Sequence, residues 1–150
     1  MASDRTHTAA AEALNGLVAA LVRSRPREMS LTAAATLSTL ERTGPRRITE
    51  LAVVEGVTQP SMTTLVGNLE KEGMVRRHSD PDDGRATLVA ITDAGMAFMR
   101  GRRARNTASL ERLIAKLEDG EKAALNSAIN AVIRLTQLDE NERDPARAHS

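Results

Sequence analysis

The sequence predicts a mainly α-helical protein with a small β-wing, a winged helix-turn-helix flanked by N- and C-terminal helices. Three observations within residues 48–92 support this fold class. Two short helical segments meet at Gly56, the second of them ends at Gly73, and two strands separated by an acidic turn follow. A helix, a tight turn, a second helix and a hairpin form a shape that fits double-stranded DNA. The stretch therefore predicts a function as well as a fold.

The composition is that of one small helical domain, or of one subunit of a small oligomer. The 150 residues include one Phe, no Trp and no Tyr, so the core must be slender, and burial between subunits would help to stabilise it. The absence of Cys excludes disulfides and thiolate metal sites. We find neither a signal peptide nor the run of ~20 apolar residues that a membrane span needs, so we expect a cytoplasmic protein without a membrane partner.

The first helix is expected within residues 8–29. Pro26 should end it, because the residue before a proline avoids helical dihedral angles. Ser30 is a suitable N-cap for a second helix, which should stop before Gly44. The apolar residues of the first helix follow the i, i+3, i+4, i+7, i+8 spacing of one face: Leu14, Leu17, Val18, Leu21 and Val22.

The helix-turn-helix and its wing are expected within residues 30–92. A short third helix should run from about 49 to 55 and end at Gly56. Thr58 can cap the fourth helix, with Pro60 in the first turn, where a missing N–H costs nothing. Gly73 suits the position that follows the helix end.

The wing should consist of two strands, about 74–79 and 86–92, joined by a turn that is rich in Asp, Pro and Gly. Thr92 is a suitable cap for a long helix from about 93 to 117. A last helix follows, and the tail from Asp139 is polar, so we expect it to fray.

The fourth helix has two faces of different character. Its apolar positions, Met62, Leu65, Val66 and Leu69, would attach it to the core. The opposite face would lie in the major groove, where short polar side chains can donate to or accept from base edges and Thr methyl groups can contact thymine. This predicted major-groove set is Gln59, Ser61, Thr63, Thr64 and Asn68. The alternative is an ordinary solvent-exposed polar face.

Arg85 lies at the end of the hairpin turn, where its guanidinium could enter a minor groove. We expect Asp83 to hold that guanidinium in a bidentate pair, and Asp80 and Asp82 to serve as turn residues. The alternative for the pair is a surface salt bridge of little energetic value. Further cations are candidate phosphate ligands, which position the protein on DNA without reading the sequence: Arg46, Arg47, Lys71, Arg76 and Arg77.

The net charge of the chain does not by itself indicate a nucleic-acid partner. The whole chain has a formal net charge of +1, and residues 46–92 contain six basic and seven acidic side chains. DNA binding would therefore depend on where the basic groups are placed, not on a general positive field.

The chain resembles the MarR family of bacterial transcription regulators over about residues 10–138. The combination of helix motif, acidic wing turn and strand-to-helix junction is specific, although each piece alone is weak. The matching stretches are Leu31-Thr32, 48–52 (Ile-Thr-Glu-Leu-Ala), 56–61 (Gly-Val-Thr-Gln-Pro-Ser), 69–77 (Leu-Glu-Lys-Glu-Gly-Met-Val-Arg-Arg), 80–85 (Asp-Pro-Asp-Asp-Gly-Arg) and 91–95 (Ile-Thr-Asp-Ala-Gly).

The resemblance implies a homodimer that binds double-stranded DNA at a pseudo-palindromic promoter site, usually as a repressor. Residues 8–29 and 110–138 would form the dimerisation helices, and 93–109 would connect them to the wing. Many such regulators release DNA when a small phenolic or anionic ligand binds. The dimerisation residues would come from two apolar stripes that need a partner: Leu14, Leu17, Val18, Leu21, Leu125, Ile129, Val132 and Ile133.

Two features depart from the family pattern. Without Cys, the thiol-oxidation switch of the peroxide-sensing branch is impossible. The fourth-helix face also lacks the arginine that some relatives have; Thr64 and Asn68 occupy that region, so the base preference should differ.

Other functions have less support in the sequence. A winged-helix module for protein–protein contacts, without DNA binding, is the main alternative and is favoured by the near-neutral winged segment. We see no catalytic spacing and no Gly-rich phosphate loop, so we expect neither an enzyme nor a cofactor. His7, His78 and His149 are scattered, which disfavours a metal site.

Overall fold

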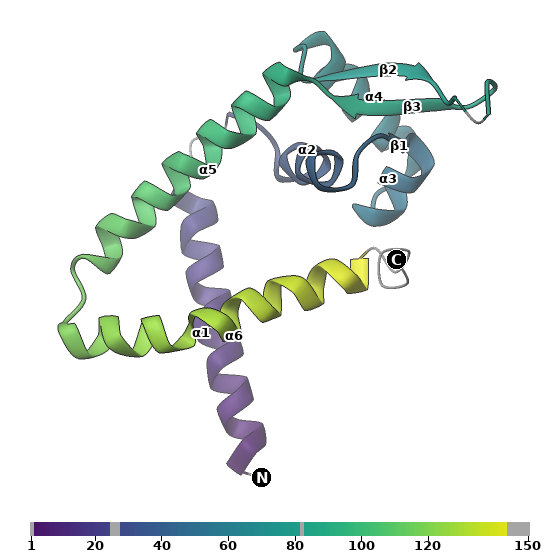
Figure 1. Cartoon of the computed structure of the whole chain (residues 1–150). Helices are drawn as coiled ribbons and strands as arrows, with labels where there is room; N and C mark the ends of the chain where they lie inside the picture. The colour runs from purple at the N-terminus through teal and green to yellow at the C-terminus, as the bar shows by residue number, and fades with distance from the viewer. Residues whose placement is uncertain (1, 25–27, 82, 144–150) are drawn as a thin grey trace. The chain divides into compact units, whose positions relative to one another are not determined.

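The computed structural model describes residues 2–24, 28–81 and 83–143 and separates into two compact units, Met1–Ser30 and Leu31–Ser150 (Figure 1). The first unit contains one helix, α1 (Ala2–Ser24), which begins before the expected residue 8. Pro26, which we expected to end this helix, lies outside the described residues.

The helix-turn-helix occupies the beginning of the second unit. It contains α2 (Leu31–Thr43), α3 (Ile48–Val54) and α4 (Gln59–Lys71). A two-residue strand, β1 (Arg46–Arg47), precedes α3. We did not expect this strand, because two charged residues have no apolar alternation that would indicate one.

The wing is a hairpin of β2 (Val75–Ser79) and β3 (Thr87–Ile91). The antiparallel sheet has the order β1-β3-β2, so β3 is its central strand. Val75 pairs with Ile91 and Ser79 with Thr87, which leaves residues 80–86 as the wing turn. Figure 1 shows this turn projecting beyond the helices of the lobe.

The core lies where α2, α3, α4 and the sheet meet. Apolar side chains from each of these elements are almost completely buried, and α4 contributes the side that we expected to face inward, with Leu65 partly exposed. Close packing of this kind is the main source of stability in a small lobe. The principal members are Leu37, Leu40, Leu51, Met62, Val66, Leu69, Val75 and Val89.

The wing is joined to α5 (Asp93–Ile114) by a close junction. Thr92 caps the helix as expected, because its Oγ1 accepts from the Gly95 N–H at 3.0 Å. The same hydroxyl lies 2.6 Å from the Gly73 carbonyl oxygen, and the Thr92 N–H donates to Met74 O at 3.0 Å. A side chain at position 95 would overlap Met74 O and approach Ile91 Cγ1 to 2.8 Å, so the junction requires glycine.

The last helix, α6 (Asp119–Arg143), continues through Asp139, so the expected fraying at 139–143 is wrong. The rest of the tail lies outside the described residues. Neither α1 nor α6 has a buried apolar residue among those described; Leu17 is 46% exposed and Ile129 is 48% exposed. The two stripes predicted from the sequence are thus open to solvent in a single chain.

Candidate nucleic-acid interface

The turn between α3 and α4 fixes the direction of the exposed helix. Gly56 has φ +63°, a left-handed conformation that glycine adopts without strain, and the Val57 N–H donates to Ala52 O. Thr58 then caps α4, because its Oγ1 accepts from the Ser61 N–H at 3.4 Å. These local contacts confirm the predicted turn and cap.

The outer face of α4 carries all five residues of the predicted major-groove set on exposed positions. The opposite side is inserted in the core through Met62, Val66 and Leu69. Burial of this side leaves the polar side as the surface that α4 presents to any partner. The five residues of this surface, called the α4 face below, are Gln59, Ser61, Thr63, Thr64 and Asn68.

Two hydroxyl groups of the α4 face already donate to the backbone. Thr63 Oγ1 donates to Gln59 O at 2.9 Å, and Thr64 Oγ1 donates to Pro60 O at 3.1 Å. Each oxygen keeps lone pairs that can accept a hydrogen bond, and each residue keeps a methyl group. In the major groove, an adenine amino group and a thymine methyl group match these two features.

Arg85 stands exposed at the end of the wing turn, as expected. The expected bidentate pair with Asp83 is wrong. Instead, the backbone N–H of Arg85 donates to Asp83 Oδ1 at 3.2 Å, and Asp83 Oδ2 lies 3.6 Å from Nη2 of Arg47. The guanidinium of Arg85 is therefore not held by this carboxylate.

Arg47 pairs with acidic groups of the wing. Its Nη2 donates to Asp80 Oδ2 at 2.8 Å, and its backbone N–H donates to Glu50 Oε2 at 3.0 Å, at the start of α3. The hydrogen bond to Asp80 is the main reason why the pKa of Arg47 is raised above its ordinary value. Sequence reasoning treated Asp80 only as a turn residue, since nothing in the local pattern connects positions 33 residues apart.

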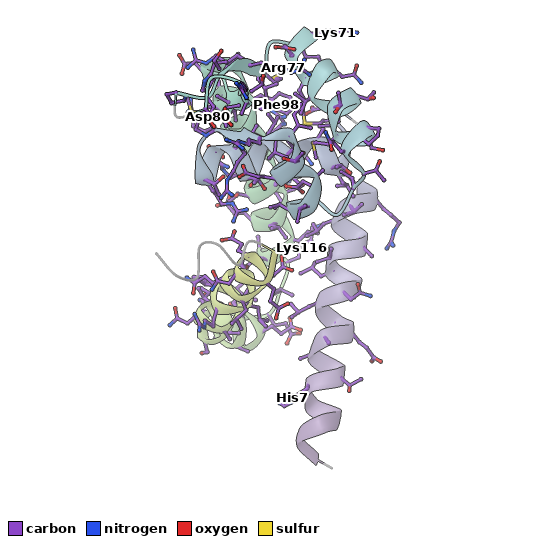
Figure 2. All side chains as sticks on the ribbon, turned by 90° about the vertical axis from the view of Figure 1, so that its right-hand side faces the viewer. His7, Lys71, Arg77, Asp80, Phe98 and Lys116 are labelled. Atoms are coloured by element: carbon purple, nitrogen blue, oxygen red, sulfur yellow. The ribbon has the colours of Figure 1, made fainter. Side chains whose placement is uncertain are left out.

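The remaining candidate phosphate ligands lie on β1, α4 and β2. Arg46 Nε donates to Thr43 Oγ1 at 3.1 Å. Arg76 is exposed, while Nη1 of Arg77 lies 3.5 Å from Glu70 Oε2. Lys71 is exposed at the end of α4. In Figure 2, Lys71, Arg77 and Asp80 appear at the winged end of the second unit, well away from Lys116.

A hollow of about 180 Å³ is formed by residues of α2, α3 and the end of α6. Its lining contains Arg42, paired with Glu140 at 2.9 Å, together with Glu55 and Asp139. Acidic groups outnumber the one guanidinium, so the hollow suits a neutral or cationic molecule better than an anion.

Within the described ranges, His, Asp and Glu side chains do not gather into a group that could hold a metal ion. Across the same ranges, every helix is too short or too polar to span a bilayer.

The fold and the α4 face define a winged-helix DNA-binding protein. The family model described as "MarR family" matches residues 29–87. An uncharacterized HTH-type transcriptional regulator from Mycobacterium bovis is 36% identical over 71% of this chain and 75% of its own length. The chain belongs to the MarR family of transcriptional regulators.

Solved structures share the fold. The crystal structure of RV1404 from Mycobacterium tuberculosis matches with a TM-score of 0.73 and 21% identity, covering 91% of this chain and 95% of that one. FabT from Streptococcus pneumoniae, solved in complex with DNA, matches with a TM-score of 0.57 and 20% identity over 89% and 96% of the two chains.

Proposed function

We propose that this protein is a homodimeric repressor that inserts α4 into the major groove of a pseudo-palindromic promoter site. The α4 face carries the proposal: one side of the helix is fixed in the core, and the exposed side consists of short polar groups. Such groups match the donors and acceptors of base edges. FabT, which has the same fold and was solved in complex with DNA, supports DNA binding by a protein of this fold.

The dimer is proposed from the terminal helices. Exposed apolar residues follow one face of both α1 and α6, and contiguous exposed apolar surface often marks a protein–protein contact. A two-fold dimer that covers them would present two copies of α4 to half-sites about one helical turn, ~10 bp, apart. The wing would add Arg85 at the neighbouring minor groove, where a narrow groove attracts a guanidinium.

Release by a small effector is part of the proposal. BpsR from Bordetella bronchiseptica, whose structure concerns regulation of DNA binding by 6-hydroxynicotinic acid, shares this fold (TM-score 0.55, 16% identity, covering 84% and 91% of the two chains). A hydroxylated aromatic acid, a class that includes the phenolic acids, is therefore the first to test. The acidic lining of the hollow at Arg42 argues that an anionic effector would bind elsewhere.

The first test is a titration of the DNA upstream of the chain's own gene at fixed salt. Wild-type protein should protect two half-sites in a footprint, and Arg85→Ala should weaken binding by about 1–3 kcal/mol while the protein stays folded. Arg102→Ala, which removes an equal charge on α5 outside both the wing and the proposed dimerisation segments, is the matched control and should change little. Equal effects of the two substitutions would contradict the minor-groove role.

The same titration distinguishes the proposed DNA binding from the main alternative, a winged-helix module for protein–protein contacts. The winged segment has six basic and seven acidic residues, which favours a protein–protein module over a general DNA binder. A module of that kind would fail to retard the upstream duplex even at low salt, where phosphate contacts are strongest. Binding that weakens steeply as salt rises and remains specific for the upstream site would exclude it. Addition of phenolic acids to the footprint tests the effector.

A further inference from the structure

We propose that Arg47 and Asp80 form a clamp that orients the wing, so that Arg47 promotes DNA binding as a positioning residue and not as a phosphate ligand. The clamp is defined here as the Arg47 guanidinium with the Asp80 carboxylate that it bonds and the Asp83 carboxylate beside it. The inference rests on the proposed DNA binding and concerns how the wing is positioned for it.

The geometry ties two distant parts of the lobe together. Arg47 ends β1 and precedes α3, whereas Asp80 directly follows β2. Nη2 of Arg47 lies 2.8 Å from Asp80 Oδ2 and 3.6 Å from Asp83 Oδ2. The Asp80 side chain is only 11% exposed, whereas the Arg47 side chain is 43% exposed. The carboxylate is therefore largely shielded from water, while the guanidinium is partly open to it.

The turn that carries Arg85 also contains both carboxylates of the clamp. The Asp80 N–H donates to Ala86 O at 2.9 Å, and the Ala86 N–H donates to Asp83 O at 2.8 Å. The carboxylate of Asp83 also accepts from the backbone N–H of Arg85. One guanidinium therefore lies close to two acids of this turn that would otherwise repel each other (Figure 2 labels Asp80).

The other end of the clamp is fixed as well. The Arg47 N–H is bonded to Glu50 in the first turn of α3, and Arg47 pairs with Leu88 on β3. The clamp thus links the position of the wing turn to the start of α3. A phosphate that approached Nη2 of Arg47 would have to compete with two carboxylates for that nitrogen.

The experiment is a double-mutant cycle in the full chain, with Arg47→Ala, Asp80→Ala and the double variant. We expect each single variant to weaken binding to the upstream site about tenfold, and the double variant to be no weaker than the worse single one. Loss of affinity on removal of an acid is the diagnostic result, because removal of a negative charge near DNA would otherwise strengthen binding. Glu72→Gln, at the exposed end of α4, is the control and should leave affinity unchanged or slightly higher.

Two further readouts distinguish positioning from a phosphate contact. Arg47→Ala should leave the slope of log K against log salt unchanged, whereas a lost phosphate contact would reduce it by ~0.9. Without DNA, hydrogen exchange of the Ala86 amide should be accelerated in both single variants.

The outcomes separate the two proposals. Stronger binding by Asp80→Ala, additive losses or a reduced salt slope in Arg47→Ala would overturn the clamp while DNA binding stands. A wild-type protein that binds no duplex would overturn the proposed function.

Discussion

Leu37 on α2 and Ile129 on α6 are both apolar residues within amphipathic helices, yet the first is fully buried and the second is 48% exposed. The difference holds for the two regions as a whole. The helix-turn-helix lobe buries most of its apolar side chains among its own helices and sheet, with Leu31 and Val53 as exposed exceptions, while α1 and α6 leave theirs open among the described residues. The lobe therefore buries its core within one chain, whereas the proposed dimer would be needed to cover the apolar residues of the terminal helices.

The largest expected effect comes from a substitution in α6, where the apolar side chains are exposed. Ile129→Asp places a charge in the stripe that the proposed dimer would bury, and burial of an unpaired charge is so costly that association should weaken at least roughly a hundredfold. Sedimentation equilibrium over a range of protein concentrations would measure it.

Asn130→Asp is the matched control for this change. It adds the same charge at the next position of α6, which lies off the apolar stripe. A dimer of wild-type affinity in Ile129→Asp would show that α6 is not part of the interface. Circular dichroism of both variants should show the lobe still folded.

A smaller effect tests how tightly the lobe is built. Gly95→Ala should lower the free energy of unfolding by about 1–3 kcal/mol, since the added methyl group would overlap Met74 O at the junction of wing and α5. Urea unfolding followed by circular dichroism is the measurement.

Gly67→Ala, in the middle of α4, is the control for this second change. A methyl group there meets nothing within 4 Å, and alanine favours a helix over glycine by up to ~1 kcal/mol, so the variant should be at least as stable as the wild type. Equal destabilisation of both variants would contradict the steric account of Gly95.

The sequence predicted the local features of the lobe well. Thr58, Gly73 and Thr92 act through neighbours within a few residues, so their helix caps and turns could be read directly from the chain. The inward and outward sides of α4 followed from helical periodicity for the same reason. The sequence alone therefore predicts the α4 face, and its contacts with DNA stay a prediction.

Contacts between charged residues distant in the chain escaped prediction. Arg47 and Asp80 are 33 positions apart, and Glu41 and Arg103 are 62 apart. No periodic pattern connects such pairs, because a surface charge can bond whichever opposite charge the fold brings near it. Strand β1 was missed for a similar cause: its pairing with β3 is determined by tertiary contacts.

The smallest expected effect concerns the pair that joins α2 to α5. Arg103 donates to both carboxylate oxygens of Glu41, at 2.6 and 2.8 Å, and this hydrogen bonding lowers the pKa of Glu41 below its ordinary value. A lowered pKa in the folded state means that the pair stabilises the protein above about pH 4.3 and that this contribution is lost as the pH falls through the folded-state pKa. Because the Arg103 side chain is 53% exposed, Arg103→Ala should cost less than ~1 kcal/mol at pH 7. Urea unfolding of the wild type and of Arg103→Ala should show this difference in the free energy of unfolding at pH 7 and a smaller difference at pH 3.

Glu41→Gln is the control, because it removes the carboxylate and should also remove the pH dependence of the pair. A difference between wild type and Arg103→Ala that stays constant from pH 7 to pH 3 would show that the α2–α5 contact does not depend on this ion pair.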